Sequence, residues 1–193
     1  MKKGLLIIVA IIVVIAGLAG CSYNPIVSKE ETVKKEWGNV QNTYQLRADK
    51  IPNLVATVKG AAAHEKNTLE AVMAARAKAT QVTVNADDLS PEAIQKYQAA
   101  QGELSQALGR LMMVQENYPD LKANQNFLSL QDEISGIENR INVARNNFNT
   151  AVNDYNSSIR KFPASITAMI FGFKTKGYFE AEAGAQSAPK VEF

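Results

Sequence analysis

The strongest constraint on the fold is an apolar repeat of three and four residues in the C-terminal half of the chain. Its members are Phe127, Leu130, Ile134, Ile137, Ile141, Ala144, Phe148, Ala151, Tyr155 and Ile159. Residues at this spacing share one face of an α-helix, so the pattern predicts a single amphipathic helix that buries its apolar face against other helices. At about 1.5 Å per residue, such a helix is roughly 55–60 Å long.

The same spacing recurs in three earlier segments. The first carries Val33, Trp37, Val40, Tyr44, Ile51, Leu54 and Val58, with Arg47 out of character; the second carries Leu69, Val72 and Met73; the third carries Ile94, Tyr97, Leu104, Leu108, Leu111 and Val114. Ser28 and Glu31 form a capping box that predicts a helix start, and Ser90 followed by Pro91 predicts another. We therefore expect an all-α fold, an antiparallel up-down four-helix bundle with long helices, preceded by an N-terminal membrane-targeting segment.

The number of helices depends on Pro52. Proline lacks an amide donor and disfavours helical angles at the preceding residue, so a break or kink is expected between Asp49 and Pro52. Asp49 could then cap a second helix. The heptad spacing continues unbroken across Pro52, which argues instead for one continuous rod. Segment lengths of about 20–40 residues favour four helices, and we predict that the chain reverses at this proline.

The N-terminus has the pattern of a membrane-targeting segment that ends at the single cysteine. Two lysines precede an uncharged run from Gly4 to Gly20, which as a helix spans about 26 Å and is slightly short for a hydrocarbon core of about 30 Å. The end of this run, Leu18-Ala19-Gly20-Cys21, resembles the bacterial lipobox, in which the cysteine is acylated and becomes the new N-terminus. We expect residues 1–20 to be a lipoprotein signal and Cys21 to be lipidated, since two or more acyl chains hold a protein stably on a bilayer. The alternative is a transmembrane helix.

Charge and composition argue against several function classes. Cleavage before Cys21 would remove two of the 21 basic residues and leave 19 against 19 acidic ones, a balance that does not attract nucleic acid. His64 is the only histidine, so a Ser-His-Asp triad with a spare base and a histidine metal cluster are both excluded. Glu65 and Glu70 do not share a helix face, and no phosphate-binding glycine loop occurs. We expect no enzyme activity, no cofactor and no metal, with His64 on the surface of the second helix.

The predicted last helix also carries a row of asparagines. Its apolar repeat from Phe127 to Ile159 is called the seam from here on. The row comprises Asn139, Asn142, Asn146, Asn149, Asn153 and Asn156. At about 100° per residue the row centres about 150° from the seam, on the opposite face. The row is either a solvated back face or a docking surface, where neutral amides hydrogen-bond a partner without a charge penalty. Asparagine is a poor helix former, so a row that met only water would weaken the helix without forming a compensating contact. This is the reason to keep the second interpretation.

A longer motif around Pro52 resembles the signature of the LemA family. It consists of Arg47, Asp49, Ile51, Pro52, Asn53, Leu54 and Val55, followed by Lys59, Gly60, His64 and Glu65. Further matches run from Tyr23-Asn24 through Tyr118-Pro119-Asp120, Glu138-Asn139, Arg145, Phe148-Asn149, Tyr155-Asn156 and Phe162-Pro163 to Tyr178-Phe179. Ala48, Lys50 and Ala61 depart from the residues common in the family. The resemblance implies a membrane-tethered antiparallel helical bundle of bacterial envelopes, without an established chemistry.

The segments that flank the bundle are assigned from composition. We expect residues 21–27 to be a tether, residues 28–162 the LemA-like bundle, and residues 163–193 a tail packed on the bundle or near the membrane. Within the tail, Ile166 to Phe173 could cover the end of the bundle, or could rest in the headgroup region with Lys174 and Lys176 facing anionic lipid. Residues 184–193 have the composition of a loose terminus.

Two functions of different classes are compatible with the sequence. The first is a lipid-tethered scaffold of the cell envelope, in the inner or the outer membrane, which binds another envelope protein or itself. The alternative is a module that holds a small apolar or lipid ligand between its helices, with Trp37, Tyr44, Met112, Met113 and Phe148 as lining residues.

Overall fold

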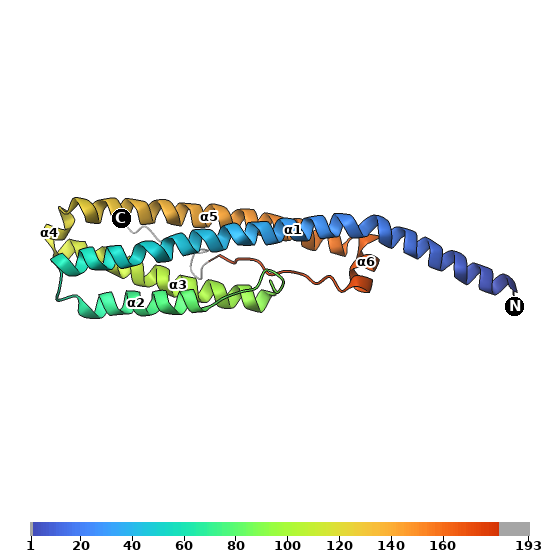
Figure 1. Ribbon diagram of the computed structural model, residues 1–193, viewed down its shortest axis with the longest axis horizontal. Helices are drawn as coiled ribbons and strands as arrows, with labels where there is room; N and C mark the ends of the chain where they lie inside the picture. Colours follow the sequence, from blue (N-terminus) through green and yellow to red (C-terminus); the bar gives the residue numbers. More distant parts are fainter. Residues whose placement is uncertain (1, 182–193) are drawn as a thin grey trace, which may run out of the picture.

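The computed structural model describes residues 2–181, and the all-α prediction is confirmed (Figure 1). The elements are α1 (Lys2–Ala61), α2 (Lys66–Gln81), α3 (Pro91–Met113), the 3-10 turn η1 (Val114–Asn117), α4 (Pro119–Lys122), α5 (Gln125–Arg160) and α6 (Ala164–Phe171). The predicted loose terminus at 184–193 lies outside the described residues. No β-strand occurs within residues 2–181.

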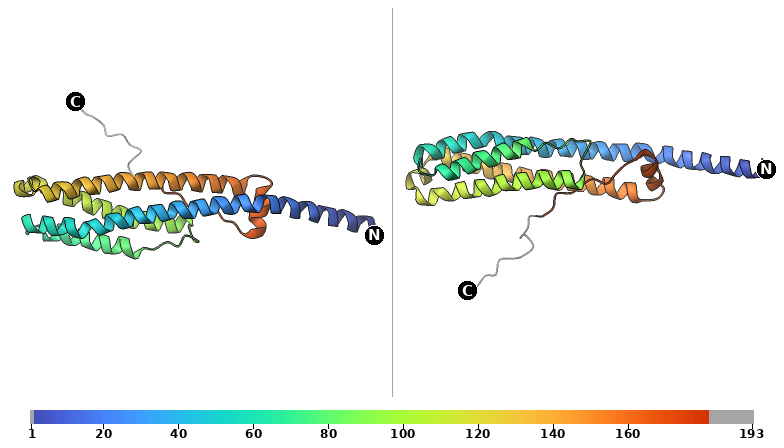
Figure 2. Two further views of the ribbon diagram at one scale, coloured as in Figure 1. Left: turned by 45° about the horizontal axis from the view of Figure 1, so that its top comes forward. Right: turned by 90° about the horizontal axis from the view of Figure 1, so that it is seen from below.

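The long helices α1, α2, α3 and α5 run side by side, and the N-terminal part of α1 extends beyond the others (Figures 1 and 2). The closest pairs are α1 with α5 and α2 with α3. Two apolar clusters fill the interior, one around Trp37, Tyr97 and Phe148 and one around Leu54 and Leu111. The helices α1, α3 and α5 contribute to both clusters, whereas α2 contributes only to the second.

The predicted reversal at Pro52 is wrong, because α1 continues through this proline. A proline inside a helix leaves the carbonyl four residues earlier without its usual donor, here that of Ala48. Arg76 on α2 supplies a replacement, since its Nε donates a hydrogen bond to the Ala48 carbonyl at 2.7 Å. The continuous heptad spacing was therefore the better guide, and a tertiary contact compensates for the missing amide.

The chain reverses instead at residues 62–65, in the turn between α1 and α2. His64 lies exposed in this turn, so its predicted place on the second helix is wrong. The Tyr118 hydroxyl donates to Glu65 Oε1 at 3.1 Å and so joins this turn to the connection before α5. The four long helices thus arise from a later reversal than the proline suggested.

The predicted helix start at Ser28 is also wrong, because α1 begins at Lys2. Ser28 lies inside the helix, where its carbonyl accepts a hydrogen bond from the Thr32 hydroxyl at 3.0 Å. Residues 21–27, expected to be a tether, continue α1, and Ile26 is buried in the core. No helix in the described part of the chain is long and apolar enough to cross a membrane.

Two other boundaries follow local capping rules. Ser90 occupies the N-cap position of α3 with Pro91 at the first helical position, as predicted, although its side chain makes no capping hydrogen bond. Asn124 caps α5, because its Oδ1 accepts hydrogen bonds from the amides of Asn126 and Phe127 at 3.0 and 3.2 Å. This cap fixes the start of the helix that carries the asparagine row.

Candidate interaction groove between α3 and α5

A groove lies between α3 and α5, with α1 as its floor. In the described part of the chain these two helices scarcely pack against each other directly, although both contact the rest of the bundle. The groove has a volume of about 730 Å³. Its walls include Gln98 and Gln106 of α3 and Asn142 and Arg145 of α5, and Arg47 lies on the floor. Most of the lining residues carry polar side chains, which can form hydrogen bonds with a bound segment.

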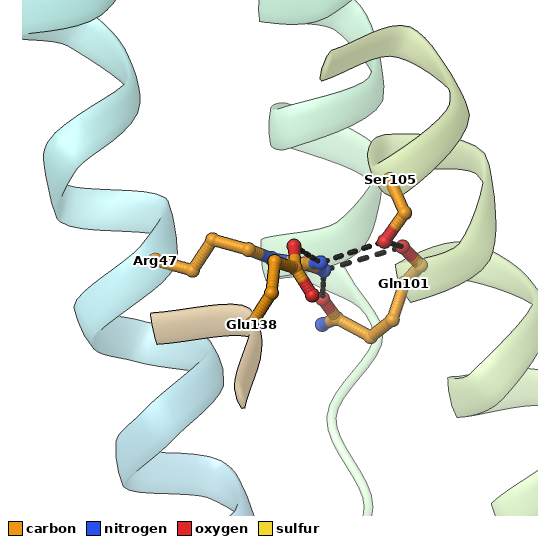
Figure 3. Close-up of polar contacts among 4 residues, drawn as sticks. All are labelled: Arg47, Gln101, Ser105 and Glu138. Atoms are coloured by element: carbon orange, nitrogen blue, oxygen red, sulfur yellow. Dashed lines mark hydrogen bonds and ion pairs between the residues drawn. The ribbon is translucent and has the colours of Figure 1, made fainter. Parts of the chain in front are cut away.

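Arg47 is the centre of a buried polar layer at the floor of the groove (Figure 3). Its Nη1 donates to Ser105 Oγ and to Glu138 Oε1, both at 2.7 Å. Its Nη2 donates to the carbonyl and to the side-chain oxygen of Gln101, at 3.2 and 2.7 Å. One side chain of α1 is thereby bound to both walls of the groove.

The charges of this layer are unequally exposed. Arg47 is 1% exposed, whereas the side chain of Glu138 is 36% exposed and still reaches solvent. The guanidinium also lies over the Tyr44 ring, with Cζ 5.1 Å from the ring centroid, and its Nε has no hydrogen-bond partner among the described residues. Burial raises the pKa of the neighbouring Tyr97 above the ordinary value of a phenol, so this side chain stays neutral. Among the described residues that line the groove, Arg47 is the one buried charge.

The polar layer separates the two apolar clusters of the bundle. Along α1, the first cluster ends at Tyr44 and the second begins at Ile51, with Arg47 between them. A buried group that needs several partners disfavours helix registers that leave those partners out of reach. Arg47 is therefore suited to fix how α1, α3 and α5 align.

The end of the chain, residues 173–181, runs beside the starting end of α3 as an extended strap (Figure 2), and its last two residues, Glu180 and Ala181, line the groove. Three amide side chains each bond both backbone groups of one strap residue. Asn156 binds Lys176, with both distances at 2.9 Å; Asn149 binds Phe179, also at 2.9 Å for both. Gln98 binds Glu180 at 2.9 and 3.0 Å. At these three residues, side chains take the place of the neighbouring strand that would bond the backbone in a β-sheet.

Side chains of the strap anchor it at two further points. Phe179 is buried against Trp37 and Phe148, with ring centroids 6.2 and 5.5 Å apart. The Lys176 ammonium forms an ion pair with Glu30 at 2.8 Å and is itself 7% exposed. The strap is therefore part of the packed structure.

Gly177 lets the strap pass close to the start of α3. Its amide donates to the Leu89 carbonyl at 2.9 Å. A Cβ at this position would lie 2.6 Å from Cα of Pro91, which is closer than two non-bonded carbon atoms can approach. Only glycine fits here without a shift of the backbone.

The asparagine row divides between the two interpretations that the sequence left open. Asn149 and Asn156 bind the strap, so part of the row is a docking surface for the chain's own tail. The remaining members, Asn139, Asn142, Asn146 and Asn153, are exposed. Their side chains make no hydrogen bond within residues 2–181, which agrees with a solvated face. Asn142 differs from the other three because it lines the groove.

The LemA family model matches residues 36–193 of the chain. The chain belongs to the LemA family. No curated protein matches the chain. Several residues by which the sequence resembles LemA proteins meet at the strap and the groove, namely Arg47, Glu138, Arg145, Asn149, Asn156 and Phe179.

The LemA signature around Pro52 is spread over the C-terminal part of α1 and the turn that follows it. Arg47 lies beneath the groove, whereas Ile51 and Leu54 are buried in the second apolar cluster and Val55 packs against it. Asp49 accepts a hydrogen bond from Gln45, and Pro52 and Asn53 remain within the helix. Lys59, Gly60, His64 and Glu65 lie at or near the turn before α2. The signature does not form one site, and only Arg47 of its members lines the groove.

Cys21, the predicted lipidation site, is exposed on α1. Residues 2–181 contain no group of three or more His, Cys, Asp or Glu side chains arranged to hold a metal ion.

Sequence reasoning missed Gln98, Gln101 and Ser105, which form the α3 side of the groove. They are spaced by three and four residues, but polar residues at this spacing are also typical of a solvent-exposed helix face, so the spacing did not indicate a site. The one available signal was on α5, where Asn142, Asn149 and Asn156 recur every seven residues.

Proposed function

We propose that this LemA protein is a non-enzymatic, membrane-tethered scaffold of the cell envelope, whose groove between α3 and α5 binds an extended segment of another envelope protein. The observation that carries the proposal is the way side chains of α3 and α5 hold the strap beside the groove. Gln98, Asn149 and Asn156 contact its backbone N–H and C=O groups. Recognition of this kind requires that the bound segment has an extended backbone, and it depends little on which side chains that segment carries.

The spacing along α5 leaves room for one more such contact. Asn149 and Asn156 are seven residues apart, about 10.5 Å along the helix axis. Their partners Phe179 and Lys176 are three residues apart, about 10 Å in an extended chain. Asn142 lies one further heptad along, lines the groove, and has no side-chain partner within the described residues. An extended partner segment can therefore bind Asn142 in the way that the strap binds Asn149.

The proposal of a membrane tether is supported by the sequence before the bundle. The uncharged run from Gly4 to Gly20 and the lipobox-like residues that follow it end at Cys21, which is exposed. An acylated Cys21, or a transmembrane segment in its place, would hold the bundle at a membrane surface.

The alternative of a small apolar ligand is supported by no specific observation. Trp37 and Phe148 are fully buried and contact each other with ring centroids 5.5 Å apart. Tyr44 packs against Tyr97 at 5.4 Å, and Met113 is 63% exposed. These side chains pack in the core or face solvent, and they do not converge on one apolar cavity.

Site-specific photo-crosslinking in intact cells tests the scaffold proposal. A photoreactive residue is placed at Asn142 in the groove, and as a matched control at Asn153, an exposed asparagine on the same helix that lines no part of the groove. We expect the residue at position 142 to crosslink one defined segment of an envelope protein, and the residue at 153 to give no such product. Mass spectrometry of the crosslinked peptides identifies the segment.

Three results would contradict the proposal. Equal crosslinking from both positions would mean non-specific contact. Crosslinks from position 142 only to the chain's own residues 182–193 would make the groove an internal docking site. Crosslinks only to a second copy would make the function self-association.

A further inference from the structure

An apolar patch lies at the end of the bundle from which the N-terminal part of α1 emerges. It consists of Phe162, Met169, Ile170 and Phe171, which are 77%, 84%, 57% and 56% exposed. Three of them belong to α6, whose opposite side is buried through Thr167 and Ala168 against α1 and α5. Large apolar side chains this exposed and this close together mark a surface that another apolar medium covers.

The patch lies beside the point at which the proposed tether begins. Tyr23 contacts Phe171 and Phe173, with ring centroids 4.8 and 5.8 Å apart. Tyr23 follows Cys21 by two residues on the same helix, about 3 Å along its axis. Figures 1 and 2 show α6 beside α1 where the N-terminal part of α1 leaves the bundle. A bilayer that holds an acylated Cys21, or the uncharged residues 4–20, therefore lies next to the patch as well.

The charges around the patch have the sign that fits an anionic surface. Arg160, Lys161 and Lys174 are exposed and flank the patch on both sides in the sequence. No aspartate or glutamate occurs in residues 160–175 or in residues 21–29. Cations beside exposed aromatic and aliphatic side chains are characteristic of segments that lie in the interfacial region of a bilayer.

We infer that the patch on α6 inserts into the headgroup region of the membrane and is a second contact that fixes the bundle's orientation. A single tether at the end of α1 would allow the bundle to tilt in any direction. With α6 also in contact, only orientations that keep α6 against the bilayer remain, and the far turn with His64 points away from it. This inference rests on the proposed tethering.

Lipid quenching of an added tryptophan tests the inference. The full chain, with its native anchor, is reconstituted into vesicles of phosphatidylethanolamine and phosphatidylglycerol. Met169→Trp places a fluorophore in the patch. Met113→Trp is the matched control, because Met113 is also well exposed (63%) but lies at the end of α3 far from α6. Trp37, the only native tryptophan, is buried in the core and gives a constant background.

We expect the variants to float with the vesicles, and the added emission at position 169 to shift to the blue and to be quenched by lipids brominated near the glycerol end of their acyl chains. The added emission at position 113 should be unaffected. Flotation without quenching at position 169 would overturn the inference and leave the tether intact. A blue shift without quenching would mean that a second copy covers the patch, which also overturns it. Failure to float would overturn the tether and this contact together.

Discussion

Removal of one asparagine that holds the strap should destabilise the protein, although asparagine is a poor helix former. Asn156 is 7% exposed and makes three side-chain hydrogen bonds, two to the backbone of Lys176 at 2.9 Å and one to the Tyr178 hydroxyl at 3.2 Å. At about 0.5–1.5 kcal/mol net for each, their loss costs about 1.5–4.5 kcal/mol. Alanine regains up to about 0.7 kcal/mol of helix propensity. Asn156→Ala should therefore lower the free energy of unfolding by about 1–4 kcal/mol.

The matched control is Asn153→Ala, one turn earlier on the same helix. Asn153 is exposed and its side chain has no hydrogen-bond partner within residues 2–181, so only the propensity term applies. This variant should be unchanged or more stable by up to about 0.7 kcal/mol. The two substitutions are chemically identical. Asn156→Ala is predicted to lower the free energy of unfolding, and Asn153→Ala to leave it unchanged or raise it.

Urea unfolding of the full chain in detergent, followed by Trp37 fluorescence, measures both variants. Trp37 stacks on Phe179 of the strap at 6.2 Å, so its emission also reports release of the strap before global unfolding. Hydrogen exchange at the amides of Lys176 and Phe179 should accelerate in Asn156→Ala alone. Equal stability and equal exchange in the two variants would refute the view that the amide contacts hold the strap.

Three further predictions concern the helix, the strap and the tether. Arg76→Met removes the donor to the Ala48 carbonyl, which Pro52 leaves unbonded, and should cost about 1–3 kcal/mol in urea unfolding, whereas Arg110→Met, an exposed control, should cost less than about 0.5 kcal/mol. Gly177→Ala forces a Cβ against the backbone of Pro91 and should destabilise the protein by about 1–3 kcal/mol with faster exchange of the Phe179 amide; unchanged exchange would contradict the close approach. Cys21→Ala should lose the acyl mass in intact-mass analysis of extracted protein, and should lose membrane retention in cell fractionation. An unmodified wild-type chain that starts at Met1 would show that Cys21 is not lipidated.

Helix type and core positions could be predicted from the sequence because they depend on local spacing. The seam from Phe127 to Ile159 gave α5, and nearly all of its members are buried. Ser90 and Pro91 marked the start of α3 because capping is decided by neighbouring residues. The all-helical class followed from the same periodicity.

The error at Pro52 and the unpredicted contacts of the strap have a common physical cause. In both cases a backbone group is satisfied by a side chain that is distant in the sequence. The carbonyl freed by Pro52 is bonded by Arg76, and the backbone of the strap is bonded by Gln98, Asn149 and Asn156. Such contacts have no period, so local rules predict a break at the proline and do not identify the side chains that hold the tail. The asparagine row was visible as a pattern, but its partner was not.

The most direct test of the account is the affinity of the crosslinked partner segment, prepared as a synthetic peptide, for the full-length protein and its Asn142→Ala and Asn153→Ala variants. Loss of one pair of amide contacts to a peptide backbone is worth about 1.4 kcal/mol, so Asn142→Ala should weaken binding about tenfold. Asn153→Ala should bind like the wild type. Equal affinity in all three proteins would mean that the groove between α3 and α5 does not bind the partner, and the scaffold proposal would be wrong.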